Sequence, residues 1–347
     1  MKKVAVIGYG GQGSWHCSQI LNSDVVSLAG IYDIKSARCD AARNNGIKVY
    51  NSFEEVLKDE TVDIVLIAVP NDVHKEQVVS ALNAGKNVIC EKPVEMSVSA
   101  LDEMIDASVR NKKLFSVHQN RRWDVDFLAM KKIAESGEIG ELINIESRIH
   151  GSRGIPSDWR CEKEHGGGMI LDWGVHLIDQ ILQICKGKIS RIFCTCSHIT
   201  NSEVDDGFKL NIFFEDGKTA YVEVGTYNFL PLPRFYMQCK EGSAIISDWR
   251  HKAHVAKLTA WIEKDVTPVQ NAAGITKTMA PRDELTLDEY EVDRPESDVH
   301  DFYRNYCAAL DGKEEIIVKL SEVRRVMQVM EAAFKSDELN QMVEVNI

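Results

Sequence analysis

A glycine-rich turn near the start of the chain constrains the fold more than any other feature. The segment Gly8–Gly13 has the pattern G-x-G-x-x-G. It follows an apolar run, Lys3–Gly8, that predicts a buried strand, and it opens a helix-like segment, Gln12–Leu21. An acidic residue, Asp33, ends the next apolar run 20 residues after Gly13. This order and spacing are typical of a dinucleotide site in a βαβ unit; the alternative is a glycine-rich turn without a ligand.

The glycines of this turn have different physical roles. Gly8 permits the tight turn, Gly10 lets the backbone approach a pyrophosphate, and Gly13 lets the helix pack against the sheet. The helix N-terminus at Gly11 and Gln12 supplies N–H donors and the positive end of the helix dipole. We therefore expect the whole segment to bind the phosphates of a dinucleotide.

Asp33 bears on the choice of cofactor. A carboxylate at this place accepts hydrogen bonds from the adenosine ribose and repels a 2′-phosphate, which favours NAD over NADP. Lys35 and Arg38 follow at once, however, and an arginine there is able to hold a phosphate. Their alternative role is a solvated helix face. We predict NAD, with NADP as the less favoured cofactor.

The first 120 residues alternate apolar, β-branched runs with helix-like segments. Such alternation predicts an α/β fold, a Rossmann dinucleotide-binding domain with a parallel sheet covered on both faces. The expected strands are Lys3–Gly8, Val25–Tyr32, Ile47–Tyr50, Val62–Val69, Asn87–Cys90 and Leu114–Val117. The expected helices are Gln12–Leu21, Ile34–Asn44, Val73–Ala84 and Val98–Val109.

The pattern changes after residue 120, so we predict domains at 1–120 and 121–347. Strands with period-two alternation predict a C-terminal α+β domain with a large, mainly antiparallel open sheet. The expected strands start at Leu142 and include 208–214, 220–224, 236–239 and 244–247; the expected helices are 169–184, 299–310 and 321–336. Residues 263–298 have many charges and several prolines, which favours a long surface loop over a strand pair.

Net charge, hydropathy and cysteine spacing indicate which partners and which cellular compartment to expect. Lysine and arginine total 41 and aspartate and glutamate total 53, giving a net charge of −12, which disfavours nucleic acid and anionic membranes as partners. No apolar run is long enough to span a bilayer. The nine cysteines form no paired or metal-binding framework, so we expect reduced thiols in the cytoplasm and no metal site.

Four further segments give the chain a specific resemblance. They are Glu91-Lys92-Pro93, Val69–His74, His118–Asp124 and Gly166–Asp179. Together with the glycine turn they resemble the Gfo/Idh/MocA oxidoreductases, which include glucose–fructose oxidoreductase and inositol dehydrogenases. The resemblance implies a nicotinamide-dependent dehydrogenase that acts on a sugar or cyclic polyol.

The resemblance also implies roles for individual residues. Lys92 matches a lysine beside the nicotinamide and the reacting oxygen, and Asp172 and His176 match a helix-borne pair in which the histidine is the acid/base. The residues placed along the cofactor are Pro70, Asn71, His74, Glu91, Lys92, Trp159 and Arg160.

Elementary chemistry agrees with these assignments. Oxidation of a secondary alcohol needs a base for the hydroxyl proton, and a histidine suits that step near neutral pH. Asp172 and His176 are four residues apart on a predicted helix, so they share one face. Lys92 follows a strand end, where ligands bind in open α/β sheets. The alternatives are a surface lysine, a helix-capping carboxylate and a core histidine.

Four other residues are candidate substrate ligands beside this group. Asn120 and Arg122 lie in the predicted cross-over between the domains, His150 ends a predicted strand, and Asp179 continues the face of Asp172 and His176. For Arg122 and Asp179 the alternative is a salt bridge or packing role, and for His150 it is a plain loop position.

The sequence is also compatible with other functions. The enzyme could oxidise C3 of a glucoside and so prime a later elimination, or it could be a glycoside hydrolase that recycles bound NAD. From another class, the chain could be a ligand sensor without catalysis. Aromatic residues such as Phe213 and Tyr221 fall on the second face of the C-terminal sheet, so we expect a homodimer or homotetramer through that sheet.

Overall fold

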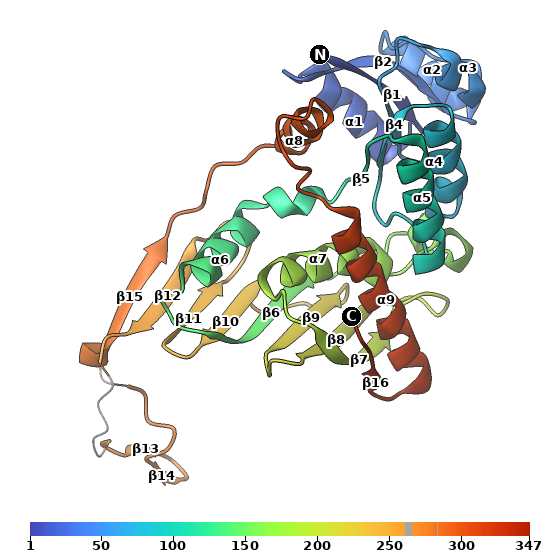
Figure 1. Ribbon diagram of the computed structural model, residues 1–347. Coiled ribbons are helices and arrows are strands. Elements are labelled where there is room, and N and C mark those ends of the chain that lie inside the picture. The colour runs from blue at the N-terminus through green and yellow to red at the C-terminus, as the bar shows by residue number, and fades with distance from the viewer. Residues whose placement is uncertain (261–265, 283) are drawn as a thin grey trace.

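A computed structural model describes residues 1–260, 266–282 and 284–347 of the chain. Two sheets organise these residues, one in each half of the chain (Figure 1). Within the described residues, no helix combines the length and the apolar character that crossing a membrane requires.

The N-terminal sheet has five parallel strands in the order β2-β1-β3-β4-β5, as expected for a Rossmann domain. Ile64, Val65, Leu66 and Ile67 of its central strand are all fully buried, because helices cover both faces. The elements are β1 (Lys2–Ile7), α1 (Gly11–Leu21), β2 (Val26–Tyr32), α2 (Ser36–Asn44), α3 (Phe53–Lys58), β3 (Ile64–Ile67), η1 (Asn71–Val73), α4 (His74–Asn83), β4 (Asn87–Cys90), α5 (Val98–Asn111) and β5 (Phe115–Val117).

Two local predictions for this sheet were wrong. The expected strand Ile47–Tyr50 contributes a single bridge, between Val49 and Ile31, and no full strand. The helix α3 was not predicted. This helix is short and has few buried residues. It begins after Ser52, whose side chain accepts a hydrogen bond from the Glu55 N–H. This N-cap stabilises the start of the helix.

The C-terminal sheet has nine strands in the order β15-β12-β11-β10-β6-β9-β8-β7-β16. The β6–β9 pair is parallel and the other pairs are antiparallel, so the predicted open, mainly antiparallel sheet is confirmed. Its strands are β6 (Leu142–His150), β7 (Ile189–Ser197), β8 (Gly207–Phe214), β9 (Thr219–Gly225), β10 (Phe235–Cys239), β11 (Gly242–Ile246), β12 (Ala253–Leu258), β15 (Leu287–Val292) and β16 (Val343–Glu344).

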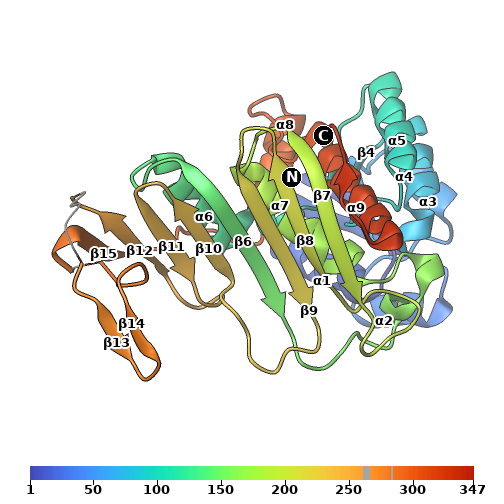
Figure 2. The ribbon, with the colours of Figure 1, turned by 90° about the horizontal axis from the view of Figure 1, so that it is seen from below.

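Helices cover one face of this large sheet and leave the other open. Figure 2 shows the strands in front, with the helices behind them. In β8, Leu210 and Ile212 are buried under the helices, whereas Lys209 on the open face is exposed. The remaining elements of this half are η2 (Asn120–Trp123), α6 (Val125–Ser136), η3 (Trp159–Cys161), η4 (Lys163–His165), η5 (Ile170–Gly174), α7 (Val175–Ile184), α8 (Asp301–Leu310) and α9 (Leu320–Leu339).

The prediction for this half was incomplete, and it was wrong for one segment. The strands β7, β12 and β16 and the helix α6 were not predicted. The expected surface loop at 263–298 contains, in its described part, a hairpin of β13 (Val269–Asn271) and β14 (Gly274–Thr276), and the strand β15, which pairs with β12. The edge of a sheet tolerates such a charged strand because one of its sides stays in water. Residues 263–265 and 283 of the predicted loop lie outside the described residues.

The C-terminal helices return to the N-terminal sheet. Tyr306 of α8 is fully buried, and its hydroxyl lies 3.1 Å from the Val88 carbonyl oxygen and 2.9 Å from that of Leu114. The side chain thus bridges the strand β4 and the start of β5. A helix more than 180 positions after the first sheet therefore completes the core of that sheet.

Candidate functional site

The glycine turn leaves no room for side chains at two positions. Gly8 has φ +91°, and a Cβ there would lie 2.3 Å from the Ala68 oxygen. A Cβ on Gly13 would lie 1.9 Å from the Gly8 oxygen, so the turn and α1 are in direct backbone contact. Gly11 is exposed, with no atom within 4 Å of the equivalent point, and Gln12 is exposed beside it. The exposed start of α1 is therefore accessible to a ligand.

Asp33 lies at the end of β2, directly beside this turn. Its Oδ2 accepts a hydrogen bond from the Tyr9 N–H at 2.7 Å and lies 3.3 Å from Arg38 Nη1. A Cβ on Gly10 would in turn lie 3.3 Å from the same Arg38 nitrogen. Asp33 is 7% exposed while the Arg38 side chain is 43% exposed, so a buried carboxylate and an exposed cation lie together at this end of the sheet.

A cavity of about 590 Å³ extends from this point along the ends of the strands. Gly8, Asp33, Arg38 and Pro70 line one side of it, and the segment 158–165, with Trp159, lines the other. A narrow glycine cradle, an exposed helix start and a cavity of this size fit a dinucleotide. The residues present therefore suit an NAD(P) molecule.

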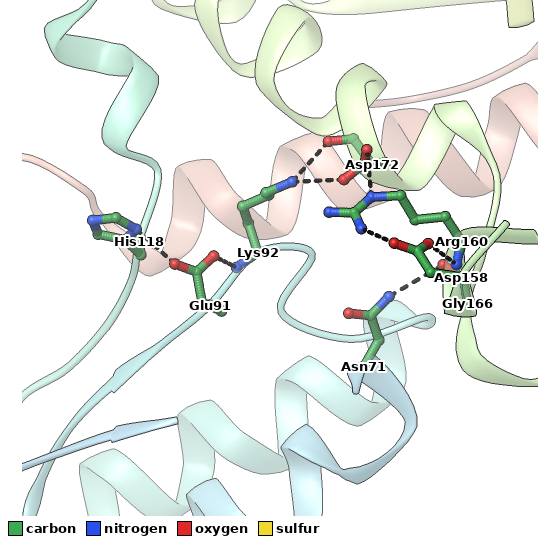
Figure 3. Close-up of polar contacts among 8 residues, drawn as sticks. All are labelled: Asn71, Glu91, Lys92, His118, Asp158, Arg160, Gly166 and Asp172. Atoms are coloured by element: carbon green, nitrogen blue, oxygen red, sulfur yellow. Dashed lines mark hydrogen bonds and ion pairs between the residues drawn. The ribbon is translucent and has the colours of Figure 1, made fainter. Parts of the chain in front are cut away.

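Asn71 and His74 belong to the segment that also supplies Pro70 and Val73 to the cavity lining. Asn71 donates from Nδ2 to the Gly166 oxygen at 3.1 Å and so ties the N-terminal half to the segment before α7 (Figure 3). His74 is fully buried, with Nε2 2.9 Å from the Val69 oxygen and Nδ1 3.1 Å from the Pro93 oxygen. The prediction that His74 binds cofactor is thus not supported, because the ring is fully buried and both of its nitrogens lie within hydrogen-bonding distance of backbone carbonyl oxygens.

Lys92, Asp172 and Arg160 meet at the junction of the two halves (Figure 3). Lys92 follows β4, and its Nζ lies 2.9 Å from the Asp172 carbonyl oxygen and 3.0 Å from its Oδ1. Arg160 donates from Nε to the other carboxylate oxygen at 3.1 Å. Burial would raise the pKa of Asp172, but the Lys92 and Arg160 cations outweigh it and hold that pKa below its usual value. The peptide bond between Lys92 and Pro93 is cis.

His176 lies one turn after Asp172 and is 4% exposed. Its Nδ1 is buried without a hydrogen-bond partner in the described part of the chain. Burial lowers the pKa of His176 well below its usual value, and the positive charges of Lys92 and Arg121 add to this effect. The imidazole is therefore neutral near pH 7 and able to accept a proton.

The helix that carries these residues differs from the prediction. A regular helix from Met169 to Ile184 was expected, but Ile170–Gly174 forms a π-helical turn before α7 begins at Val175. Asp172 lies inside this turn, and its carbonyl oxygen accepts a hydrogen bond from Lys92. Such turns interrupt the usual i,i+4 bonding and are frequent at functional sites.

Glu91 was predicted beside the cofactor, yet its carboxylate is bound inside the protein. One oxygen, Oε1, contacts the rings of His16 and His118, and the other, Oε2, accepts the Lys92 N–H at 3.0 Å. The side chain is 6% exposed. The carboxylate therefore lies behind Lys92 and has no free oxygen for a cofactor.

Arg122 and Asp179 bind each other and not a common ligand. Arg122 donates from Nε and Nη2 to the two oxygens of Asp179, at 2.8 and 2.6 Å, and the side chains are 3% and 2% exposed. Arg122 also reaches Glu322 of α9 at 2.6 Å. The salt-bridge alternative is correct here, since burying either charge alone would be strongly unfavourable.

The prediction that His150 binds substrate is wrong, because the strand alternation turns it away from α7. It shares the open face of the sheet with Arg148, and its Nδ1 accepts the Leu232 N–H at 3.1 Å. Its Nε2 lies 3.6 Å from Glu223. Asn120 opens η2 and lines a separate cavity of about 310 Å³ with Trp15 and Asp298.

Sequence reasoning missed an aromatic wall beside His176. The ring of Trp173 lies 6.0 Å from the His176 ring and 5.9 Å from the Trp249 ring, centroid to centroid. The Arg121 guanidinium stands 4.3 Å above Trp173. Trp173 was visible in the glycine-rich motif, but nothing in the sequence connected it with Trp249.

Trp159 and Arg160 were predicted to lie along the cofactor. The guanidinium carbon of Arg160 lies 4.7 Å from the centre of the Trp159 ring, so the two side chains contact each other.

The fold and this site define an NAD(P)-binding oxidoreductase. Residues 2–119 match a family model described as "Oxidoreductase family, NAD-binding Rossmann fold", and residues 127–245 match the "GFO/IDH/MocA C-terminal domain". The chain belongs to the Gfo/Idh/MocA family of oxidoreductases, as its motifs indicated.

Known relatives agree with this assignment. An NAD-binding protein from Listeria innocua shares 45% identity over 99% of both chains, with a TM-score of 0.95. An uncharacterized oxidoreductase of Schizosaccharomyces pombe is 41% identical over 40% of this chain and 38% of its own length. The NADP-dependent scyllo-inositol 2-dehydrogenase of Bacillus subtilis is 27% identical over 70% of this chain and 68% of its own length. The match thus spans well under half of the first of these two curated relatives.

Proposed function

We propose that this protein is an NAD(P)-dependent dehydrogenase that oxidises a secondary hydroxyl of a sugar, glycoside or inositol. The observation that carries the proposal is the contact of Lys92 with Asp172, 3.0 Å from Nζ to Oδ1, beside a neutral and buried His176. These three groups stand at the carboxyl end of the parallel sheet, where ligands bind in open α/β folds. The inositol dehydrogenase among the relatives supports the same substrate class.

The three side chains divide the proton chemistry among them. A bound nicotinamide supplies the acceptor for the hydride that leaves the carbinol carbon. His176 takes the hydroxyl proton, since its lowered pKa keeps the ring neutral. An ammonium has three N–H donors. Lys92 directs two of them to Asp172, which leaves one for the substrate oxygen as negative charge develops there.

Asp172 positions the other two groups. Its carboxylate bonds to both Lys92 and Arg160, so it remains ionised and fixes the direction of the lysine side chain. Trp173, the next residue, has its ring 6.0 Å from the His176 ring, and the Arg121 guanidinium covers one face of that Trp173 ring. We propose that the rest of the ring packs against the C–H face of a pyranose or cyclitol ring, which favours a cyclic polyol over a linear one.

We propose NAD as the preferred cofactor. Asp33 is nearly buried at the end of β2 and accepts two backbone N–H bonds, at 2.7 and 2.8 Å, so it stays in place to meet a ribose. Arg38 stands beside it and would favour a 2′-phosphate. The relatives include both an NAD-binding protein and an NADP-dependent enzyme.

The experiment combines a substrate panel with one variant. Inositols, aldoses and glucosides are tested for reduction of NAD and NADP, and His176→Ala is compared with His254→Ala, which alters an exposed histidine. We expect His176→Ala to lower kcat by about 10²–10⁴-fold, because general base catalysis is lost, while cofactor affinity is unchanged. Equal turnover in both variants contradicts the assignment.

Three other outcomes would redirect the proposal. Product formation without free NADH indicates a hydrolase that recycles its cofactor. A 3-keto glucoside as product indicates an enzyme that primes an elimination. Binding of cofactor and sugar with no reduction of the cofactor indicates a sensor.

We further propose a homodimer or homotetramer that forms through the open face of the nine-stranded sheet. Phe213 and Tyr221 lie half-buried on that face, which has a surface cavity of about 400 Å³ between them and Arg148. The nine cysteines are all free thiols, and a reducing compartment such as the cytoplasm suits them.

A further inference from the structure

A buried polar cluster connects four distant parts of the chain directly behind Lys92. It consists of His16 on α1, Glu91 after β4, His118 after β5 and Tyr303 on α8. His16 and Tyr303 are 0% exposed, His118 is 1% exposed and Glu91 is 4% exposed. Such a group is costly to bury unless its members satisfy one another. Its presence beside the proposed catalytic lysine therefore calls for a reason.

The bonds of the cluster converge on one carboxylate. His16 Nε2 lies 2.6 Å and His118 Nδ1 lies 2.9 Å from Glu91 Oε1, and the Lys92 N–H lies 3.0 Å from Oε2. Burial would raise the pKa of Glu91, but the attraction and hydrogen bonds of His118 and His16 lower it well below its usual value. Glu91 is therefore an anion that accepts three N–H donors.

The far end of the cluster reaches the C-terminal half of the chain. His16 Nδ1 contacts the Tyr303 hydroxyl. Burial lowers the pKa of His16, so the ring is neutral. A neutral ring that donates from Nε2 accepts at Nδ1, and Tyr303 is then the donor. The chain of bonds runs from Tyr303 through His16 and Glu91 to the backbone of Lys92.

Direct hydrogen bonds distinguish this cluster from a metal centre. The ligand atoms of His16, Glu91 and His118 lie within 4.8 Å of one another, a spacing that an ion could also use. At 2.6 and 2.9 Å, however, the nitrogens and the oxygen touch each other, and a metal ion would require about 2.0–2.2 Å to each atom with the ion between them.

Lys92 is consequently held at both ends. Asp172 holds its ammonium from the C-terminal half, and Glu91 holds its backbone N–H from the N-terminal half. We propose that the Tyr303–His16–Glu91–His118 cluster is a positioning device that fixes Lys92 for catalysis. This inference rests on the proposed function for its catalytic meaning, but the positioning itself is measurable without a substrate. Supporting partners of this kind hold a reactive group within the narrow geometry that it needs.

The first test replaces the anion at the centre. Glu91→Gln keeps the shape of the side chain and removes its charge. The rate at which Lys92 is reductively methylated by formaldehyde is measured by site-resolved mass spectrometry in the full chain, with exposed Lys112 as internal reference. We expect several-fold faster labelling of Lys92 in the variant, no change at Lys112, and a cooperative thermal transition. An unchanged Lys92 rate in a folded variant overturns the proposal.

The second test uses His118, which offers the cleanest pair of variants. Its Nε2 has no partner among the described residues, so a substitution breaks one bond, the bond from Nδ1 to Glu91. An asparagine amide places a donor near the position of Nδ1, whereas leucine keeps bulk without a donor. We expect His118→Leu to loosen Lys92 and His118→Asn to restore the parent rate. Equal labelling in both variants contradicts positioning.

Activity separates the inference from the proposed function. Where a substrate is found, Glu91→Gln should lower kcat by about 10-fold to 100-fold with little change in KM, the size of effect typical of lost supporting contacts. If Lys92 labelling responds while the parent protein oxidises no member of the panel, the positioning stands and the proposed function fails. A stoichiometric metal in the purified protein, with labelling changed by a chelator, overturns the inference.

Discussion

The two sheets of this protein bury their faces differently. In the five-stranded sheet, Ile64 to Ile67 of β3 have no exposed surface, since helices lie on both faces. In the nine-stranded sheet, Lys209 of β8 is exposed although its neighbours Phe208 and Leu210 are buried. Figure 2 shows the strands of this sheet in front, with no helix covering them on that side. A sheet covered on both faces can meet a ligand only at its strand ends. A sheet with one bare face can also meet another protein.

The difference divides the proposed tasks. The strand ends of the first sheet carry the glycine turn, Asp33 and Lys92. The covered face of the second sheet carries α7, with His176 near its start, and the proposed catalytic group forms where these two surfaces meet. The bare face lies on the opposite side and takes no part in this chemistry. Changes at the first sheet should therefore alter cofactor use, and changes at the bare face should alter assembly alone.

Among the effects that test this comparison of the two sheets, the largest is expected at the glycine turn. Gly13→Ala places a Cβ 1.9 Å from the Gly8 oxygen, so the turn or α1 must shift. Overpacking of this kind costs about 1–3 kcal/mol, and the same loss of binding free energy corresponds to a roughly 5-fold to 160-fold lower cofactor affinity. Gly151→Ala is the control, because Gly151 lies outside the turn and its Cβ would meet only the Thr226 Cα, at 4.0 Å. Titration of NADH fluorescence measures both variants, and equal affinities would show that the cradle does not hold the cofactor.

The next effect tests the bare face. Phe213→Asp puts a charge in the centre of the proposed interface and should weaken self-association by about 30-fold, as loss of a buried aromatic anchor does. Val109→Asp on α5 is the control, since Val109 is 71% exposed and lies on the other sheet's helices. Sedimentation equilibrium gives the dissociation constants. A dimer that tolerates Phe213→Asp forms elsewhere.

A smaller effect concerns the pH dependence of the reaction. His176 accepts the proton only when neutral, so kcat/KM should persist below pH 6.5 and fall as pH drops through the lowered pKa of this ring. Arg121→Gln removes one of the positive charges that lower the pKa. We expect the acid limb of the profile to move upward by up to about one pH unit. Arg250→Gln, on the exposed turn after β11, is the control and should leave the acid limb unchanged. If the acid limb has the same midpoint in both variants, the Arg121 charge does not contribute to the lowered pKa of His176.

The smallest effect concerns the choice between NAD and NADP. Arg38 is 43% exposed and shares Asp33 with backbone donors. Removing it in Arg38→Ala should lower NADP affinity more than NAD affinity, by about fivefold in the ratio, because one charge-assisted bond to a 2′-phosphate is lost. Arg43→Ala, further along α2, is the control. If the ratio does not change, Asp33 alone already excludes the 2′-phosphate.

The fold was largely predictable because its signals are local. Alternation within β8 and the turn at Gly8–Gly13 depend on residues a few positions apart, so the sequence alone reveals them. The prediction of a strand at Ile47–Tyr50 was wrong because a strand also needs a distant partner, which local sequence does not reveal. These residues suit a strand, but β2 offers a partner only at Ile31. The charged strand β15 escaped prediction because pairing with β12, and not apolar character, creates it.

The site was predictable in part. The motifs indicated Lys92 and Asp172, which are 80 positions apart, and the structure brings them to 3.0 Å. The same motifs suggested His74 and Glu91 as cofactor ligands. In the structure both side chains contact backbone groups instead: His74 contacts carbonyl oxygens, and Glu91 accepts the Lys92 N–H. A motif identifies which residues a site contains, but not which of their atoms remain free.

The dinucleotide fold, the family and the residues at the junction of the two sheets could be inferred from the amino-acid sequence alone. Three other features emerge only when the chain is folded: Asp179 neutralises Arg122, His150 faces the bare side of the sheet, and Tyr303 completes the cluster behind Lys92. The two groups of features differ in the range of the interactions that create them. Turns and strand alternation involve near neighbours, whereas each of these pairings depends on how distant segments pack and on which charges remain buried when they do.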